Sequence, residues 1–384
     1  MDPNSYPKDC FKKVGVLGAT GTVGQRFIVL LSKHPSFKLI KIGASSRSAG
    51  KTYSECVRWK QSVPIPESVR GMVVQECVPE YFEGCDIIFS GLDADVAGEI
   101  ELSFRAHELA VFSNAKNHRR DEQCPLVVPL VNPSHLDLIP HQRAHHVHPT
   151  TQKSMPLSKG FIVTNANCST TGLAVPFKAL ELAFGPIDRV FVTTLQAISG
   201  GGYPGVPSLD VLDNVVPYIS GEEEKIEWEL CKILGAFESH PPKIHHRQAG
   251  TPENLKCGPI HVSATTTRVP VLDGHTAIVS VSFADGHKPT PEKCVEAFRK
   301  FGTEARTLGC PSAPAEAIHV HDEPDRPQPR LDRYFQDGAG VNVGRVRECN
   351  VLGIKFVVLS NNVSIGAATS SVMNAELAVA KGLV

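Results

Sequence analysis

The 384-residue chain lacks an excess of charge of either sign, because 39 Lys and Arg against 40 Asp and Glu leave a formal net charge of -1. The field of the whole molecule therefore does not recruit nucleic acid or an anionic membrane surface, and any anion site must be local. The other fractions, 41% hydrophobic and 21% charged, are those of a soluble globular protein. The length is sufficient for two domains, each with its own core.

The cysteines lack the pattern of a disulfide framework or a Cys-x-x-Cys site. Eleven are present, an odd number, and none is paired at that spacing. This usage favours free thiols in a reducing compartment.

Long apolar runs and internal repeats are also missing. The first residues, MDPNSYPKDCFKK, have no apolar signal-peptide core, and no run approaches the ~20 apolar residues of a membrane span. We therefore expect a cytoplasmic protein with no membrane partner, in which the Asn-x-Ser patterns at Asn167 and Asn362 are not glycosylated.

A glycine-rich turn follows the first predicted strand. Residues 13–17 are mostly apolar, GATGTVGQ (18–25) comes next, and apolar residues then recur at helical spacing. In such a strand, turn and helix, glycines let the backbone approach a pyrophosphate, and the helix start supplies N–H donors and a positive dipole end. The pattern predicts a dinucleotide site; an ordinary tight turn is the alternative.

The second predicted strand, residues 38–43, is not followed by the acidic residue that usually binds the ribose of NAD. The chain reads ASSRS at 44–48, with Arg47 between hydroxyls that include Ser45 and Ser46. An arginine in this setting suits a 2′-phosphate, so NADP(H) is favoured over NAD. A solvated loop arginine is the alternative.

The stretch NANCSTTG (165–172) is the one around which the chain is organised. Residues 161–164 read as a buried strand and 173–184 as a helix, which places Cys168 at a strand-to-helix turn. The hydroxyls of residues 169–171 are N-cap candidates, and free N–H groups at a helix start would stabilise a thiolate. We therefore predict a nucleophilic Cys168; a buried thiol that acts as a small hydrophobe is the alternative.

Three more loops are candidate binding segments. Ser90 and Gly91 follow a predicted strand and are a plausible wall for the cofactor. The basic loop SNAKNHRR (113–120) can bind an anion, although such runs are often solvated surface. The run SGGGYPG (199–205) is too glycine-rich for a regular element, so something is expected to approach its backbone closely.

Two pairs of polar residues stand out in the second half of the chain. Glu222 and Lys225 are three apart at the start of a predicted helix and share one face, although a charged first turn that suits the helix dipole is the alternative. Residues 263–271 and 275–283 read as the two strands of a hairpin that brings Arg268 and His275 to one end of a sheet. Both can equally be hydrogen-bonded scaffold groups.

The segment 132–158 holds five histidines and several prolines without apolar periodicity, which predicts a surface insertion. No metal site is expected there, because the segment has no cysteine and one carboxylate, Asp137.

At the other end of the chain, 353–359 reads as a strand, and the helix after NNVSIGAA (361–368) is expected to pack back on the first domain.

Taken together, these residues resemble aspartate-semialdehyde dehydrogenases of the archaeal and fungal kind. The resemblance extends over essentially the whole chain and rests on an ordered set of motifs: GATGTVGQ, SNAKNHR, NANCSTTG, QAISGGGYPG, GEEEKIEWE, RVPVLDGHT and NNVSIGAA. It implies an α/β fold with a Rossmann-type NADP-binding domain, 1–166 completed by the helix at 361–384. It also implies an α+β catalytic and dimerisation domain, 167–360, like that of glyceraldehyde-phosphate dehydrogenase.

The resemblance also implies roles for individual residues. Cys168 matches the nucleophile, His275 the acid/base and Gln196 the residue that orients the acyl group. Arg268 and Glu222 match the groups that hold the substrate carboxylate and ammonium. The positions matched to phosphate are Arg119, Asn167 and Lys225, with Lys225 left open between phosphate and carboxylate. The expected cofactor residues are Gly18, Thr20, Gly21, Thr22, Val23, Ser45, Ser46, Arg47, Ser90, Gly91, Ser199, Gly200 and Asn362.

The implied reaction is the reversible, NADPH-dependent conversion of L-aspartyl-β-phosphate to L-aspartate-β-semialdehyde and phosphate, on the route to lysine, threonine, methionine and isoleucine. A homodimer or a dimer of dimers is expected, and no metal. Three alternatives stay open: an N-acetyl-γ-glutamyl-phosphate reductase, a glyceraldehyde-phosphate type dehydrogenase, and an NADP(H)-binding sensor without turnover. Glu222 argues against the first two, Arg47 against the second, and the presence of both Cys168 and His275 against the sensor.

Overall fold

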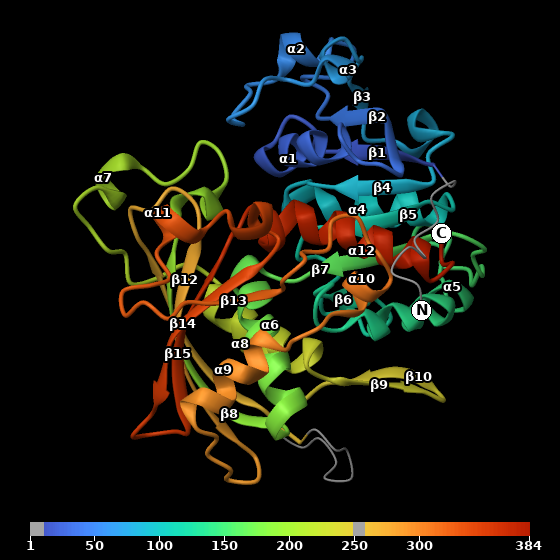
Figure 1. The fold of residues 1–384 in the computed structure, drawn as a ribbon. Helices are drawn as coiled ribbons and strands as arrows, with labels where there is room; N and C mark the ends of the chain where they lie inside the picture. The colour runs from blue at the N-terminus through green and yellow to red at the C-terminus, as the bar shows by residue number, and fades with distance from the viewer. Residues whose placement is uncertain (1–10, 249–257) are drawn as a thin grey trace.

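The structure is a computed structural model that describes residues 11–248 and 258–384. Two large sheets form two lobes, with the N-terminal sheet in one and the sheet built from the later strands in the other (Figure 1). The nine cysteines within the described ranges are free. Cys10, Cys257 and most of the N-terminal stretch discussed above lie outside those ranges.

The first sheet has seven strands, all parallel, in the order β3-β2-β1-β4-β5-β7-β6. Their bounds are β1 Lys12–Leu17, β2 Phe37–Ala44, β3 Gln75–Glu76, β4 Ile87–Ser90, β5 Ala110–Ser113, β6 Leu126–Val127 and β7 Phe161–Asn165. Alternate residues of β4 enter different apolar clusters: Ile87 and Phe89 pack in one and Ile88 in the other. This sheet is therefore buried on both faces, which explains its continuous apolar strands.

The helices that flank this sheet connect its strands. α1 (Thr22–Leu31) packs on β1 and β2, and α4 (Ala94–Ala106) packs on β5 and β7. The shorter elements are α2 Tyr53–Cys56, α3 Glu67–Arg70, η1 Pro79–Phe82, η2 Pro133–Leu138 and α5 Ile139–Ala144. Because every strand is parallel, the carboxyl ends of β1, β4, β5 and β7 meet at one edge, where ligands of such sheets bind.

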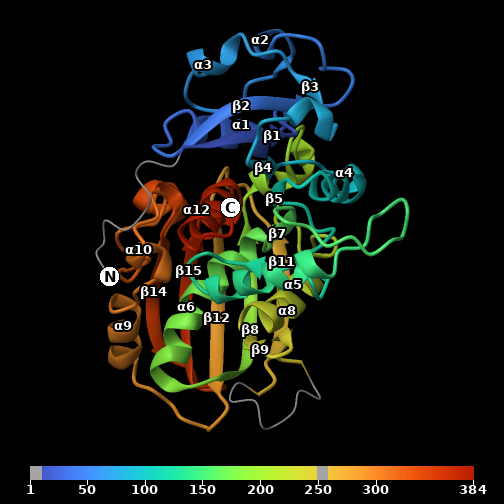
Figure 2. The same ribbon diagram turned by 90° about the vertical axis from the view of Figure 1, so that its right-hand side faces the viewer.

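The second sheet has six strands in the order β11-β8-β12-β15-β14-β13. Their bounds are β8 Ile187–Gln196, β11 His261–Arg268, β12 His275–Phe283, β13 Ile318–Val320, β14 Val341–Glu348 and β15 Ile354–Ser360. The helices α6 (Cys168–Phe184), α8 (Glu222–Ile233) and α9 (Pro291–Arg299) pack against this sheet (Figure 2). Phe191 of β8 and Ile278 of β12 remain about half exposed, so this chain leaves part of the sheet uncovered.

The predicted hairpin of residues 263–271 and 275–283 is wrong. β11 pairs in parallel with β8, β12 pairs antiparallel with the other side of β8, and the two strands therefore do not pair with each other. The turn at 272–274 crosses the end of β8 instead of closing a ribbon. Arg268 and His275 nevertheless lie at the same end of the sheet, one on each side of β8.

The remaining elements are shorter or lie at the edges. A separate two-stranded ribbon is formed by β9 (Ala236–Ser239) and β10 (Pro242–His245). The others are η3 Ile198–Gly201, α7 Ser208–Val211, α10 Glu304–Thr307, α11 Pro329–Asp332, η4 Phe335–Gly338, the π-helical turn η5 Ser364–Ala368 and α12 Thr369–Ala380. Within the described ranges, no helix combines the length and apolar character needed to cross a membrane.

The segment 132–158 is only partly a surface insertion. Its first half forms η2 and α5, and side chains such as His135, Leu136 and Gln142 are buried. Gln142 receives a 2.7 Å hydrogen bond from the N–H of Ile162 and donates to that residue's carbonyl, so α5 is fixed to β7. The surface prediction fails there because apolar side chains in a single turn of helix are too few to give a periodic pattern.

The C-terminal helix α12 lies against β4, β5 and β7 and contacts α1 (Figure 1). The amide of Asn374 donates to the carbonyl of Val127 and to Asn165 Oδ1, at 3.2 and 3.0 Å. The end of the chain thus packs on the first sheet, as the sequence predicts for 361–384. The helix is bound by polar contacts as well as by apolar packing.

Candidate active site

The nucleophile candidate lies where the chain leaves the first sheet for the second. β7 ends at Asn165 and α6 begins at Cys168. The N-cap is Asn167, whose Oδ1 accepts hydrogen bonds from the backbone N–H groups of Ser169 (2.9 Å) and Thr170 (3.3 Å). The predicted hydroxyl caps are therefore wrong: residues 169–171 lie inside the helix, which starts five residues earlier than predicted. An Asn side chain serves this position as well as Ser or Thr.

The neighbourhood of Cys168 is tightly packed. A Cβ at Gly366 would lie 2.9 Å from the Cβ of Cys168, and one at Gly172 would lie 2.2 Å from Ser360 Oγ. The start of α6 is therefore held against the loop that follows β15. Only glycine at positions 172 and 366 permits such close contact between the two segments. NNVSIGAA and NANCSTTG are therefore neighbouring segments of one site.

In the free protein Cys168 is a thiol. Burial, assisted by the carboxylate of Glu222, raises its pKa to about 12. The guanidinium groups of Arg119 and Arg268 and the N–H of Ser169 act in the opposite direction. The N–H of Ser169 at the helix start favours the thiolate, as expected, but burial has the larger effect on this pKa in the free protein.

His275 is a neutral hydrogen-bond donor. Its Nδ1 accepts a 3.0 Å hydrogen bond from the backbone N–H of Ala197, so the ring proton resides on Nε2, which is buried and has no partner among the described residues. Burial lowers the pKa of this ring to about 3, and the nearby Arg268 lowers it as well. Arg268 Nη1 donates to the carbonyl of Ala197 at 2.8 Å, so the backbone of one residue, Ala197, contacts both side chains.

The glycine-rich loop after β8 comes close to these side chains. A Cβ at Gly200 would lie 3.0 Å from Arg268 Nη1 and 3.2 Å from His275 Nε2. Asn362 donates to Ser199 Oγ and accepts from the N–H of Gly274, both at 2.9 Å. The predicted close approach to this backbone therefore occurs, and the approaching groups belong to the protein itself.

Two of the predicted substrate residues, Glu222 and Lys225, lie in the first turn of α8, and Glu222 contacts Asn167. Glu222 accepts hydrogen bonds from Asn167 Nδ2 (2.8 Å) and from Lys225 Nζ (2.6 Å), and both acceptor and amide are buried. Gln196 is buried at the end of β8, where its Nε2 donates to Thr194 Oγ1 at 3.3 Å. In this state Asn167 caps α6 and joins it to Glu222, a contact that the sequence did not predict.

Sequence reasoning missed two buried charges further along α8. Glu229 accepts hydrogen bonds from Arg119 Nη1 at 2.8 Å and from the backbone N–H of Asn167 at 2.6 Å. Lys232 Nζ donates to the carbonyls of Arg119, Asp121 and Cys124 at 2.8 to 2.9 Å. One face of this helix carries charges that alternate in sign at helical spacing, at residues 222, 225, 229 and 232. This pattern in the sequence could have indicated the two buried charges.

The cofactor candidates lie at the carboxyl edge of the first sheet. Gly18 has φ of +70°, and a Cβ there would lie 2.5 Å from the carbonyl oxygen of Gly91, so the turns after β1 and β4 touch. Gly21 caps α1 without a side-chain hydrogen bond, which leaves its first N–H groups available for a phosphate. The members of this first turn are Gly18, Thr20, Gly21, Thr22 and Val23.

Two further groups fit a dinucleotide at the same edge. Ser45, Ser46 and Arg47 are exposed directly after β2. Ser90 is buried at the end of β4, and its hydroxyl lies beside the carboxylate of Glu101. The glycine cradle, the uncapped helix start and the exposed arginine therefore fit a dinucleotide that carries a 2′-phosphate.

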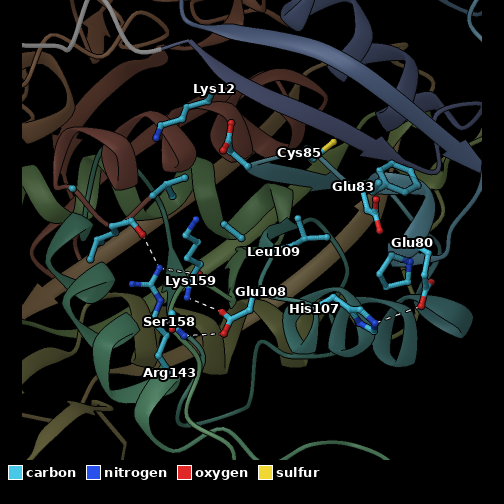
Figure 3. A pocket seen from close by; sticks show the side chains of 18 residues that line it. Lys12, Glu80, Glu83, Cys85, His107, Glu108, Leu109, Arg143, Ser158 and Lys159 are labelled. Carbon is cyan, nitrogen blue, oxygen red and sulfur yellow. Dashed lines mark hydrogen bonds and ion pairs between the residues drawn. The ribbon is translucent and has the colours of Figure 1, made fainter.

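A hollow of ≈ 630 Å³ lies elsewhere, at the opposite edge of the first sheet (Figure 3). Its lining includes Lys12, Glu108 and Arg143. The Glu108 carboxylate accepts from three backbone N–H groups, of residues 158, 159 and 160, and Arg143 Nη2 donates to two carbonyls. The charges of Glu108 and Arg143 already have partners, and none of the predicted site residues lines the hollow. Among the described residues, no cluster of His, Cys, Asp and Glu is arranged to hold a metal ion.

Comparison with known proteins agrees with this geometry. Residues 13–139 match the model "Semialdehyde dehydrogenase, NAD binding domain", and residues 177–365 match "Semialdehyde dehydrogenase, dimerisation domain". These matches confirm the predicted fold class.

Curated relatives match over nearly the whole length. The aspartate-semialdehyde dehydrogenase of Cryptococcus neoformans is 61% identical over 97% of this chain and 98% of its own length. That of Saccharomyces cerevisiae is 50% identical over 97% and 99%. A crystal structure of the Candida albicans enzyme with NADP superposes with a TM-score of 0.87 at 50% identity, over 97% of this chain and 100% of that one. The chain belongs to the aspartate-semialdehyde dehydrogenase family.

Proposed function

We propose that this protein is an NADP(H)-dependent aspartate-semialdehyde dehydrogenase that interconverts L-aspartyl-β-phosphate and L-aspartate-β-semialdehyde with phosphate, in the biosynthesis of lysine, threonine, methionine and isoleucine. The observation that carries the proposal is the convergence of Cys168, His275, Arg268 and Glu222 at one junction of the two sheets. Family membership over the full length supports the same activity.

In the proposed reaction the sulfur of Cys168 attacks the acyl carbon, the bond from that carbon to the phosphate oxygen breaks to give a thioester, and the thiol proton leaves with the phosphate. Bound NADPH supplies the hydride that reduces this thioester. The thiohemiacetal oxygen then carries the developing negative charge, and the Nε2–H of His275 is the donor suited to stabilise it. Collapse of the thiohemiacetal oxyanion releases the aldehyde and the thiolate, which takes up a proton from solvent to restore the thiol.

The surrounding charges have complementary roles in this proposal. Arg119 binds the phosphoryl group, while Arg268 binds the α-carboxylate and Glu222 the α-ammonium of the substrate. Gln196 orients the acyl group. Lys225 pairs with Glu222 in the free protein and is available to either phosphate or carboxylate. Asn167, which holds the start of α6, contributes to phosphate binding in this proposal. A thioester accepts hydride more readily than a carboxylate does, which explains why the nucleophile is a cysteine.

The cofactor residues remain those expected from the sequence: the turn of Gly18, Thr20, Gly21, Thr22 and Val23 for the pyrophosphate, and Ser45, Ser46 and Arg47 for the 2′-phosphate. Ser90, Gly91, Ser199, Gly200 and Asn362 complete the set. We propose that residues 1–166 with 361–384 form the NADP-binding domain and 167–360 the catalytic domain.

The matched dimerisation domain favours a homo-oligomer. We propose a homodimer or a dimer of dimers, in which a partner covers the exposed side chains of Phe191 and Ile278 on the second sheet. A cytoplasmic location is likewise a proposal.

One assay separates this activity from its alternatives. The protein should form NADPH from aspartate semialdehyde, phosphate and NADP⁺, and much less from N-acetylglutamate semialdehyde or glyceraldehyde 3-phosphate. NADPH binding without turnover of any of the three would instead support a sensor.

A further inference from the structure

We propose that Glu229, a residue that does not face the substrate in the proposed reaction, is a positioning residue that fixes the phosphate-binding Arg119 relative to the nucleophile Cys168. The inference rests on the proposed function for the identity of the phosphate site. The contacts that carry it are properties of the fold.

The carboxylate of Glu229 binds two elements at once. One oxygen accepts from Arg119 Nη1 at 2.8 Å, and the other accepts from the backbone N–H of Asn167 at 2.6 Å. Glu229 has no exposed surface, and Arg119 and Asn167 are buried as well. Both contacts are therefore charge-assisted hydrogen bonds shielded from water, which are the strong and directional kind.

The two elements come from different parts of the chain. Arg119 lies in the loop after β5, whereas Asn167 precedes Cys168 by one residue and caps its helix. No hydrogen bond in the described structure joins Arg119 to Asn167 directly, so the carboxylate of Glu229 is the bridge between them. A shift of either element must strain or break one of these bonds.

Arg119 is held with part of its guanidinium unused. Nη1 binds Glu229 and Nη2 donates to the carbonyl of Asn114 at 2.9 Å, while the buried Nε has no partner among the described residues. A buried N–H without a partner is costly unless a ligand satisfies it. This arrangement points to an anion at Arg119, aimed by two fixed contacts on the other nitrogens.

The negative charge of Glu229 also has an unfavourable effect on phosphate binding, because it neutralises the positive charge of Arg119. Positioning and neutralisation therefore predict opposite results when the charge is removed. In Glu229→Gln the side chain keeps its length and one carbonyl oxygen, so it can accept from Arg119 or from Asn167 but not with two carboxylate oxygens. Positioning predicts weaker phosphate binding, and simple neutralisation predicts tighter binding.

The test is the Glu229→Gln variant, with Glu224→Gln as the matched control, because Glu224 lies on the same helix and is exposed. In the oxidative direction we expect the KM for phosphate to rise about tenfold and kcat to fall, with the KM for NADP⁺ unchanged. Glu229→Asp, which keeps the charge on a shorter stem, should recover part of the loss. The control should match the wild type in every parameter.

A second readout does not depend on turnover. Inorganic phosphate should protect Cys168 of the wild type from alkylation by iodoacetamide, and about tenfold more phosphate should be needed in Glu229→Gln. Unchanged or tighter phosphate protection in a variant that melts like the wild type would overturn the positioning role. A wild type that shows phosphate protection but no turnover of aspartate semialdehyde would instead contradict the proposed function and leave the role of Glu229 intact.

Discussion

The backbone N–H of Ala197 donates to His275 Nδ1, so the histidine of this site presents an N–H rather than a lone pair. A neutral ring in this tautomer stabilises an oxyanion but does not remove a proton from the thiol. The predicted acid/base role therefore requires the ring to release Ala197 first. In the proposed reaction His275 is therefore a preorganised donor to the oxygen of the thiohemiacetal.

This tautomer has a spectroscopic consequence. Because burial lowers the pKa of His275 to about 3, its ring should stay neutral from pH 8 down to about pH 4. In ¹⁵N NMR of the labelled protein, Nε2 should be the protonated nitrogen throughout that range. Titration of this ring near pH 6.5, or a proton on Nδ1, would contradict the assignment.

A second buried histidine predicts an acid limit to stability. His135 is neutral, with Nδ1 near the amide of Asn132 at 2.9 Å and Nε2 near the carbonyl of Gly235 at 3.2 Å, and burial lowers its pKa to about 3. Between pH 6.5 and 3 the unfolded chain therefore binds a proton that the folded chain does not. Stability should fall as pH falls through this window, by up to about 1.4 kcal/mol per pH unit from this group.

Urea unfolding of the wild type and of His135→Gln at pH 6.5, 5.5 and 4.5 measures this contribution. The variant is expected to be less stable overall but to lose stability less steeply on acidification. His145→Gln, at an exposed position of the same segment, is the control and should keep the wild-type slope. Equal slopes in all three proteins would exclude His135 as the source.

Arg47 is predicted to select NADPH. It is exposed directly after β2, and residues 44–48 include no acidic side chain for a ribose hydroxyl. Arg47→Ala should weaken NADPH binding by about 1.5 to 3 kcal/mol and NADH binding little, which narrows the preference about ten- to a hundredfold. Fluorescence titration with both cofactors measures this, with the exposed Arg70→Ala as control. Equal losses for the two cofactors would show that Arg47 has no role at the 2′-phosphate.

Glu222 is predicted to have two opposite effects. Its carboxylate raises the pKa of Cys168, so Glu222→Gln should speed alkylation of that thiol by iodoacetamide at a fixed pH near 8. The same change removes the partner of the substrate ammonium and should lower kcat/KM for aspartate semialdehyde about tenfold or more. Succinate semialdehyde, which has no ammonium group, should be affected far less. Equal losses with both substrates would identify Glu222 as a structural residue of α8.

Much of the first sheet was predictable because its strands are buried on both faces and its turns carry glycine. The dinucleotide turn at Gly18 and the strand before Asn165 follow from local patterns of this kind. The hairpin prediction failed because strand pairing is a long-range property, and β8, which separates β11 and β12, lies some seventy residues earlier in the chain.

The candidate site was predictable for residues that match family motifs. It was not predictable for properties that depend on tertiary contacts, such as burial and pKa. Cys168, Arg268 and His275 converge as expected. Glu229 was missed because a glutamate in the third turn of a helix usually faces solvent. The high pKa of Cys168 was missed because burial depends on segments far away in sequence, such as the loop that contains Gly366.

In the proposed mechanism Cys168 forms a covalent acyl intermediate during turnover. The most direct test is the phosphate-dependent formation of NADPH from aspartate semialdehyde by the wild type and by Cys168→Ala, with Cys349→Ala as control because Cys349 is also a partly exposed free cysteine. Cys168→Ala should lose turnover and keep the NADPH affinity of the wild type, while Cys349→Ala should keep both. Turnover above a trace in Cys168→Ala would contradict the covalent mechanism.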